Sequence, residues 1–210
     1  MKFEAILWDW NGTLLNDVDI AIDAINQLLC NRNLVPLTLE RYLDVFTFPV
    51  QDYYRKIGFD LINEPFEIPA FQFIAIYNET VEACGLHPEV IPLLSRLQDR
   101  GCRQFILSAM EQQCLEKTVN DNGIAHYFED LCGLDNHYAT SKINNGMSLI
   151  SMNGLNPERI LMVGDTIHDY EVAVAIGCKC VLVANGHQSK ARLLSSGAKV
   201  VDSLEEIKFL

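Results

Sequence analysis

Short apolar runs alternate along much of this chain with stretches of helical periodicity. The apolar runs predict strands at Phe3–Trp8, Arg103–Leu107, Ile160–Val163 and Cys180–Val183, with a shorter one at Val200–Val201. Apolar positions three or four residues apart predict helices between them, at Val90–Arg100, Gln112–Asn122 and Tyr170–Ile176. This alternation is typical of a parallel sheet covered by helices on both faces. We therefore expect an α/β fold with a doubly wound parallel sheet, whose ligand site lies at the carboxyl ends of the strands.

One long stretch departs from this alternation. Between residues 16 and 84 the pattern predicts helices only, at Val18–Asn31, Leu39–Phe46, Val50–Ile57 and Phe71–Ala83. A crossover between parallel strands needs far fewer residues. We therefore predict an α/β core of residues 1–15 and 85–210 and an inserted α-helical cap of residues 16–84. The alternative is a set of extra helices packed on the sheet.

The charge balance limits the class of partner. The 210 residues include 16 Lys and Arg against 28 Asp and Glu, which gives a formal net charge of −12. We therefore expect neither nucleic acid nor an anionic membrane as a partner. No apolar run approaches the roughly 20 residues that span a bilayer, and the first residues lack the features of a secretory signal. A cytoplasmic protein is expected, as a monomer or a homodimer.

Polar residues follow several of the predicted strands. Asp9 follows the first strand, Ser108 the second, Lys142 a weak third element and Asp165 the strand at Ile160–Val163. Each residue alone reads as a helix cap or a solvated side chain. Because the carboxyl ends of parallel strands meet at one edge of a sheet, we expect these four side chains to be neighbours.

Two of these residues suggest a metal site. Asp9 and Asp165 would repel each other unless a hard divalent cation lay between them, and carboxylate ligands of this kind suit Mg²⁺. Asp169 lies one helical turn beyond Asp165 and can face the same site.

The other residues suggest phosphoryl chemistry. An Asp such as Asp9 can attack phosphorus and form an aspartyl-phosphate. Lys142 would supply positive charge to the phosphoryl group, while Ser108 and backbone N–H groups near Gly12 would donate hydrogen bonds to its oxygens. In an acidic protein, these local charges would have to attract the phosphate ester.

With these motifs the chain resembles the haloacid dehalogenase (HAD) superfamily. Asp9–Thr13 matches the D-x-D-G-T motif except at its third position, and Leu107–Ser108 matches the second motif. Lys142 stands where the third motif places a lysine, and Gly164–Asp169 matches the G-D-x-x-x-D motif. The layout is most similar to the phosphoglycolate phosphatase-like branch, in which a helical cap follows the first strand of a Rossmann-like core.

The resemblance implies a role for each motif residue. Asp9 would be the nucleophile of a phosphatase that acts on a small phosphorylated metabolite. The Mg²⁺ ligands would be Asp9, the backbone carbonyl of Asn11 and Asp165, with Asp169 holding the water of the metal. Phosphate would be bound by Gly12, Ser108, Ala109 and Lys142. Residues 46–54 lie where related proteins place specificity residues, and Arg55 and Lys56 are either a second anion-binding point or solvated helix surface.

Asn11 departs from the family pattern. Related phosphatases have an Asp there, which protonates the leaving alkoxide and then activates the hydrolytic water. An amide cannot carry out these proton transfers. General acid–base catalysis is worth about 10²- to 10⁴-fold, or roughly 3–5 kcal/mol of transition-state stabilisation. We therefore expect a folded, Mg²⁺-binding protein whose phosphatase activity is slow or depends on the leaving group.

Three interpretations remain open. In the first, the chain is a phosphatase whose proton transfers are slow or are supplied by water or another group, such as His168. In the second, the same nucleophile cleaves a haloacid or a phosphonate; phosphonate cleavage by relatives uses a cap lysine, and Lys56 is the only lysine in residues 16–84. In the third, the chain is catalytically impaired and binds a phosphorylated ligand.

Overall fold

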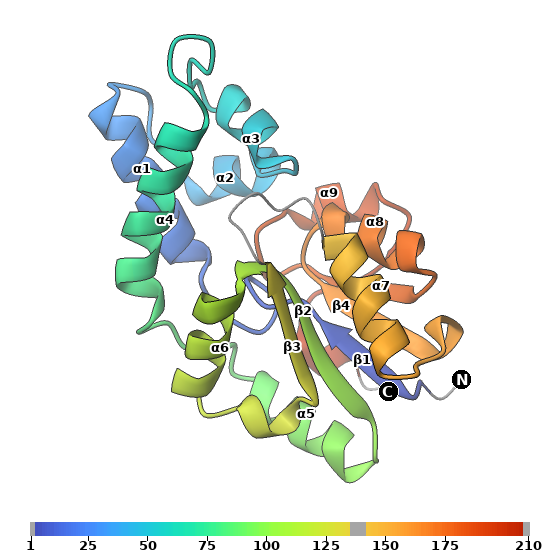
Figure 1. Cartoon of the computed structure of the whole chain (residues 1–210). Coiled ribbons are helices and arrows are strands. Elements are labelled where there is room, and N and C mark those ends of the chain that lie inside the picture. Colours follow the sequence, from blue (N-terminus) through green and yellow to red (C-terminus); the bar gives the residue numbers. More distant parts are fainter. Residues whose placement is uncertain (1–2, 135–141, 208–210) are drawn as a thin grey trace.

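A six-stranded parallel sheet forms the centre of the molecule. The computed structural model describes residues 3–134 and 142–207 (Figure 1). The strand order is β3-β2-β1-β4-β5-β6, and every neighbouring pair is parallel. The strands are β1 (Ala5–Trp8), β2 (Arg103–Glu111), β3 (Asp130–Leu134), β4 (Ile160–Gly164), β5 (Lys179–Val183) and β6 (Lys199–Val201). This arrangement confirms the predicted α/β class.

Helices connect and cover the strands. They are α1 (Val18–Asn31), α2 (Leu39–Val45), α3 (Val50–Lys56), α4 (Glu67–Val81), α5 (Val90–Asp99), α6 (Gln112–Asp121), α7 (Lys142–Met152), α8 (Ile167–Ile176) and α9 (Lys190–Leu194). Short 3-10 helices occur at Ala125–Tyr127, Pro157–Arg159 and Leu204–Glu206. No helix in the described part of the chain is both long and apolar enough to cross a membrane.

The central strand β1 is apolar throughout because helices cover both of its faces. Ile6 and Trp8 belong to a core cluster with residues of α5 and α6. Ala5 and Leu7, which point to the opposite face, belong to a second cluster with residues of α7 and α8. A strand buried on both faces gains from an apolar side chain at every position. The run at residues 5–8 therefore shows no polar alternation.

Helices α1 to α4 lie together beyond the carboxyl ends of β1 and β2 (Figure 1). Within this group α1 packs against α2 and α4, and its buried side chains continue the core cluster on the α5–α6 face of the sheet. Residues 16–84 contain helices and no strand, as the sequence pattern predicts. The division at these residues into a core and a cap domain stays a prediction.

Two helices begin earlier than the sequence pattern predicts. Helix α4 begins at Glu67 instead of Phe71, and α8 begins at Ile167 instead of Tyr170. The α8 start is set by a capping box, in which the side chains of Thr166 and Asp169 each bond to the backbone N–H of the other. Since Asp169 is also a predicted site residue, this cap fixes one carboxylate of the site.

The sequence pattern assigned no residue range to β3, α7 or α9. Strand β3 contains an Asp and a Gly, and α7 contains Gly146 and two Asn, all of them poor formers of the respective structure. Tertiary packing compensates in α7, because a Cβ at Gly146 would lie 3.0 Å from the side chain of Leu107. The glycine lets the helix approach β2 closely.

Candidate active site

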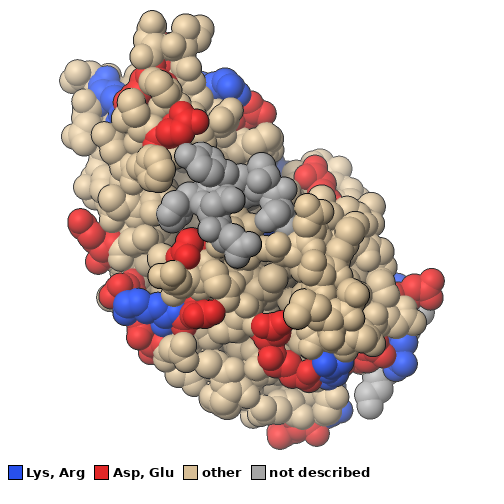
Figure 2. All heavy atoms as spheres, viewed as in Figure 1, with Lys and Arg blue, Asp and Glu red and all other residues tan. Residues whose placement is uncertain are grey.

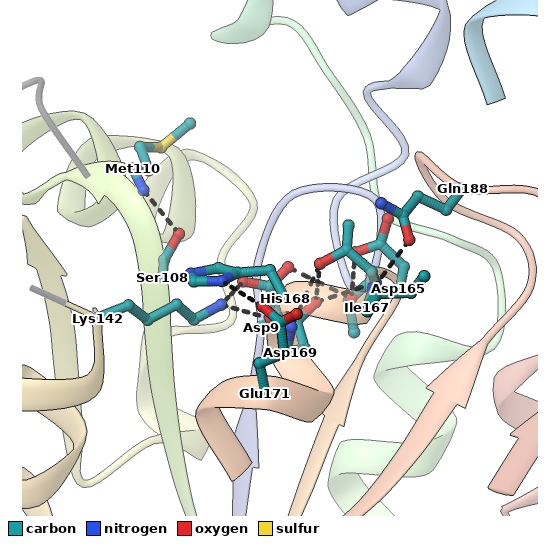
Figure 3. Close-up of polar contacts among 12 residues, drawn as sticks. Asp9, Ser108, Met110, Lys142, Asp165, Ile167, His168, Asp169, Glu171 and Gln188 are labelled. Carbon is teal, nitrogen blue, oxygen red and sulfur yellow. Dashed lines mark hydrogen bonds and ion pairs between the residues drawn. The ribbon is translucent and has the colours of Figure 1, made fainter. Parts of the chain in front are cut away.

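Four polar side chains from separate parts of the chain meet at the carboxyl edge of the sheet (Figure 3). Asp9 follows β1, Asp165 follows β4, Asp169 lies in the first turn of α8 and Lys142 is the first residue of α7. Carboxylate oxygens of the three Asp residues lie within 4.8 Å of one another. Their exposed fractions are 6%, 0% and 1% for Asp9, Asp165 and Asp169. The structure therefore brings these predicted residues together in a buried cluster.

Lys142 lies between two of these carboxylates. Its Nζ donates to Asp9 Oδ1 at 2.5 Å and to Asp169 Oδ1 at 2.6 Å (Figure 3). Burial alone would lower the pKa of Lys142, but Asp169 and Asp9 raise it, so the ammonium is charged. Burial and the charge of Asp169 raise the pKa of Asp9 well above its usual value, despite the lysine. The cluster thus places three carboxyl groups around a single ammonium group.

Hydrogen bonds fix the orientation of the other two carboxylates. Asp165 accepts from the Thr13 hydroxyl at 3.0 Å and from the His187 backbone N–H at 2.5 Å. Asp169 Oδ2 accepts from the hydroxyl and backbone N–H of Thr166 at 2.7 and 3.0 Å. Burial raises the pKa of Asp165 to about 6. Burial alone would raise the pKa of Asp169 too, but Lys142 and Thr166 lower it.

This donor set fits a hard divalent cation. Lys142 pairs with only two of the three buried carboxylates, and oxygen ligands at this density are those that such cations bind. The fit is one of chemistry and proximity, and the assignment of Asp9, Asp165 and Asp169 as metal ligands stays a prediction.

Ser108 and Ala109 lie at one side of the cluster. The sequence pattern ended the second strand at Leu107, but β2 runs to Glu111 with a register irregularity after Leu107, so Ser108 lies inside the strand. The Ser108 Oγ accepts from the Met110 N–H at 3.0 Å (Figure 3). A hydroxyl in that role keeps its own proton for another acceptor. Ala109 lines the adjoining cavity.

Gly12 allows the backbone to approach Asp165. Its φ is 70°, and a Cβ at this position would lie 2.5 Å from Asp165 Oδ2. Its N–H, however, donates to Asp17 Oδ1 at 2.7 Å and to the Leu15 carbonyl at 3.0 Å. In this conformation a buried carboxylate of the protein already accepts from the Gly12 N–H. Phosphate binding by Gly12 and the backbone N–H groups near it stays a prediction.

Asn11 is held by two residues that the sequence interpretation missed. Its Nδ2 donates to Asp17 Oδ2 at 2.9 Å and to the Tyr77 hydroxyl at 2.7 Å. Tyr77 in turn donates to Asp17 Oδ2 at 2.5 Å. The carboxylate absent at position 11 is therefore present next to it, on Asp17. The position of Asp17 is misleading in the sequence, because it precedes α1 as an N-cap would but makes no side-chain cap bond.

Asp17 forms a buried ion pair with His187, which the sequence interpretation also missed. His187 Nε2 lies 3.3 Å from Asp17 Oδ1, and its Nδ1 lies 2.8 Å from the Tyr42 hydroxyl. Burial alone would lower the pKa of His187, but Asp17 raises it to about 9. Burial alone would raise the pKa of Asp17, but His187 lowers it. His187 follows β5, so the reasoning from strand ends would have found it if applied to that strand.

The other predicted candidates lie elsewhere. His168 lines the cavity, where it stacks on Phe48 with ring centroids 4.7 Å apart, and burial lowers its pKa. Arg55 and Lys56 are exposed, and neither lines the cavity. Arg55 pairs with Asp52 at 2.6 Å. These two residues form solvated helix surface, which removes the structural basis for a second anion-binding point and for a Schiff-base lysine at position 56.

The chain resembles known proteins over nearly its whole length. A family model described as haloacid dehalogenase-like hydrolase matches residues 6–183. A phosphoglycolate phosphatase from Aliivibrio fischeri is 28% identical, over 98% of this chain and 93% of the relative. One from Rhodobacter capsulatus is 25% identical, over 88% of this chain and 85% of the relative.

Solved structures share the fold. A predicted phosphatase from Clostridium acetobutylicum superimposes with a TM-score of 0.81 at 17% identity, covering 99% of this chain and 97% of the other. A predicted phosphoglycolate phosphatase from Haemophilus somnus gives a TM-score of 0.78 at 22% identity, with 99% and 97% coverage.

The Asp17 network should contribute strongly to stability. We expect Asp17→Asn to lower the free energy of unfolding by about 3–5 kcal/mol, because it leaves the His187 imidazolium buried without its counter-charge. Urea denaturation followed by circular dichroism measures the change. The matched control is Asp52→Asn, which breaks an exposed pair and should cost less than about 1 kcal/mol. Equal losses in both variants would contradict the buried ion pair.

Gly186 should tolerate no side chain. A Cβ there would clash with the Asp165 carboxylate, whereas a Cβ at Gly85 would meet nothing within 4 Å. We expect Gly186→Ala to destabilise the protein by about 1–3 kcal/mol and Gly85→Ala to change stability by less than about 1 kcal/mol. Thermal unfolding of both variants checks this, and an unchanged Gly186→Ala would refute the close approach to Asp165.

Proposed function

Since this chain belongs to the haloacid dehalogenase-like hydrolase family, we propose that it hydrolyses a small phosphomonoester with Asp9 as nucleophile. Membership of this family makes the chain a hydrolase, and it confirms the resemblance drawn from the motifs. The observation that carries the proposal is the meeting of Asp9, Asp165, Asp169 and Lys142 in one buried cluster.

The proposed cofactor is Mg²⁺. Asp9, Asp165 and the backbone carbonyl of Asn11 would hold the ion, with Asp169 supporting them. A bound divalent cation offsets the negative charge of the carboxylates and of the phosphoryl oxygens. Three carboxylates are buried beside the single ammonium group of Lys142, and buried charges need opposite charges close by. A divalent cation would supply this further positive charge.

The proposed reaction has two steps. In the first, a carboxylate oxygen of Asp9 attacks phosphorus, the bond to the ester oxygen breaks, and that oxygen leaves with the electron pair and takes a proton from solvent. In the second, water attacks the phosphorus of the aspartyl-phosphate, the bond to Asp9 breaks, and phosphate and the Asp9 carboxylate are released while the proton of the water passes to solvent. Lys142 keeps Asp9 oriented and supplies positive charge, while the Ser108 hydroxyl and the Ala109 N–H would donate to phosphoryl oxygens.

Asn11 sets the limits of this reaction. Its amide hydrogens are directed at Asp17 and Tyr77, and an amide cannot protonate a leaving alkoxide. Turnover should therefore depend on how readily the leaving group departs as an anion.

Residues 16–84 are proposed to act as a cap over the site. Helices α2, α3 and α4 each contribute side chains to the cavity that adjoins the carboxylates. Such a group can exclude water and contact the part of the substrate beyond the phosphate. We propose a small phosphorylated metabolite as partner; a cytoplasmic location and a monomeric or homodimeric state stay predictions.

Metal binding should be measurable without turnover. We expect Mg²⁺ to raise the melting temperature, since a ligand at 100 times its Kd stabilises the native state by about 2.7 kcal/mol. EDTA should reverse the shift, Asp165→Asn should abolish it and Asp52→Asn should retain it. A shift of the same size in Asp165→Asn would show that Mg²⁺ binds elsewhere.

Exchanging the charges at positions 11 and 17 should restore acid–base catalysis. Asn11→Asp alone would place two carboxylates in contact, so the informative variant combines it with Asp17→Asn. We expect this double variant to release phosphate from alkyl phosphomonoesters about 10²-fold or more faster than the wild type, with a smaller gain for aryl esters. Mg²⁺-dependent phosphate release measures both.

Asp9→Asn should abolish release from every ester, and intact mass should exclude deamidation of Asn11 in the wild type. Release that survives in Asp9→Asn would contradict the proposed nucleophile. Wild-type activity towards haloacids or phosphonates, or none towards any ester, would favour the alternative interpretations instead.

A further inference from the structure

The cavity beside the carboxylate cluster has aromatic walls. Its volume is about 750 Å³, within the range of small-molecule sites. Nine Phe and Tyr side chains line it, contributed by α2, α3, α4 and the loops beside them. Several rings contact one another, and Phe46 lies 5.2 Å from Tyr53 between centroids. The space beyond the phosphate position is therefore suited to an apolar, ring-shaped group.

The described lining offers no spare cation for a second anionic group, because the His187 imidazolium in it already pairs with Asp17. Lys142 is its only Lys or Arg, and that ammonium already bonds to Asp9 and Asp169. Exposed carboxylates of Glu67 and Glu171 also belong to the lining. On the face shown in Figure 2, the coloured residues form no continuous patch of Lys and Arg. A substrate carboxylate would lose its hydration in this cavity without gaining a counter-charge.

The lining is equally unsuited to a cationic group. Its buried carboxylates already have partners: Asp17 pairs with His187, and Asp9 and Asp169 pair with Lys142. Asp165 accepts from Thr13 and from the His187 N–H, and Glu111 accepts from the Cys114 N–H. The carboxylates that remain, on Glu67 and Glu171, are exposed, and such groups contribute little to binding. Moving a neutral substrate group from water into this cavity therefore costs less free energy than moving a charged one.

One polar atom in the aromatic wall lacks a partner. The hydroxyl of Tyr53 is buried and makes no hydrogen bond to any described residue. A buried hydroxyl left unpaired costs about 1–3 kcal/mol, which a ligand with a hydroxyl or carbonyl group would recover. Tyr53 lies among the rings of Tyr42, Phe46 and Tyr54.

Asn11 points to the same class of substrate by a separate argument. Without a carboxylic acid at position 11, the leaving oxygen has to depart without a proton from this residue. A phenolic oxygen, with a pKa of about 10 as in tyrosine, is far more stable as an anion than an alkoxide is. The aromatic cavity and the amide therefore both favour an aryl ester.

We propose that the substrate is an aryl phosphomonoester, with its uncharged ring in the aromatic cavity and a neutral polar group on that ring at the Tyr53 hydroxyl. This inference rests on the proposed phosphatase function. The P–O bond to the aryl oxygen breaks as the bond to Asp9 forms, and the aryl oxide leaves with the electron pair and takes a proton from solvent. Water then attacks phosphorus, the bond to Asp9 breaks and the proton of the water passes to solvent.

Competitive inhibitors separate recognition of the ring from the ease with which the leaving group departs, because they are not cleaved. The assay is Mg²⁺-dependent hydrolysis of 4-nitrophenyl phosphate, inhibited by benzylphosphonate, 3-phosphonopropionate or 3-aminopropylphosphonate. These probes share the phosphonate and carry a ring, a carboxylate or an ammonium group. We expect benzylphosphonate to bind at least tenfold more tightly than either of the others. Equal inhibition, or tighter binding of a charged probe, would overturn the proposal.

A cation introduced into the wall should change this preference. Phe71 lines the cavity at an exposed position of α4, so Phe71→Arg should fold. We expect Phe71→Arg to weaken the binding of benzylphosphonate and to strengthen the binding of 3-phosphonopropionate. The ratio of the two inhibition constants should change by about tenfold. Ile68→Arg, on the same helix but outside the lining, is the matched control and should leave both inhibition constants unchanged. The same response in both variants would overturn the placement of the ring.

Tyr53→Phe tests the polar contact. This variant should weaken the binding of 4-hydroxybenzylphosphonate severalfold and leave the binding of benzylphosphonate unchanged. A purely structural role of the hydroxyl would affect the binding of both inhibitors equally.

Failure of this inference can be told apart from failure of the proposed function. If no ester is hydrolysed, the proposed phosphatase function is contradicted. If esters are hydrolysed but the inhibitor with a ring does not bind more tightly, only the proposal of an aryl substrate is contradicted.

Discussion

The site depends on the burial of three carboxylates around one lysine. Asp9, Asp165 and Asp169 lie almost out of contact with solvent, and Lys142 bonds to two of them. Removing such charges from water costs several kcal/mol per ion unless neighbouring groups compensate. The surrounding structure supplies this compensation through the Thr13 hydroxyl, the α8 capping box and the N–H of His187. A divalent cation would supply the positive charge that these groups do not.

The parallel sheet makes this concentration of charge possible. With β1 at the centre, β2 and β4 are its direct neighbours, so residues that follow β1 and β4 lie side by side. Both faces of the strands are covered by helices, which leaves the carboxyl edge as the place where polar groups gather. The side chain at Lys142 then reaches across this edge from α7 to Asp9, 133 positions earlier in the sequence.

Position 11 gains a different meaning from its surroundings. Taken alone, Asn11 is the loss of a carboxylate. In the structure, Asp17 accepts hydrogen bonds from Asn11, Gly12 and Tyr77 and pairs with His187. The negative charge therefore lies on Asp17, in contact with position 11, and His187 neutralises it. An aspartate at position 11 would be repelled by Asp17. The amide and the neighbouring carboxylate are therefore compatible with each other, and a change at one alters the other.

The sequence by itself determined the order of strands and helices apart from β3, α7 and α9, the all-helical character of residues 16–84 and most of the residues at the carboxyl edge. These features depend on local periodicity and on which residue follows a strand, both of which can be read along the chain. Tertiary structure alone decided that Asp17 faces Asn11 and His187 instead of capping α1, that Arg55 and Lys56 point to solvent, and that α7 forms despite its glycine. It also decided the aromatic lining of the cavity. The contacts involved join residues as far apart as Tyr42 and His187, 145 positions along the chain, and no local pattern specifies which distant side chains will share a desolvated space.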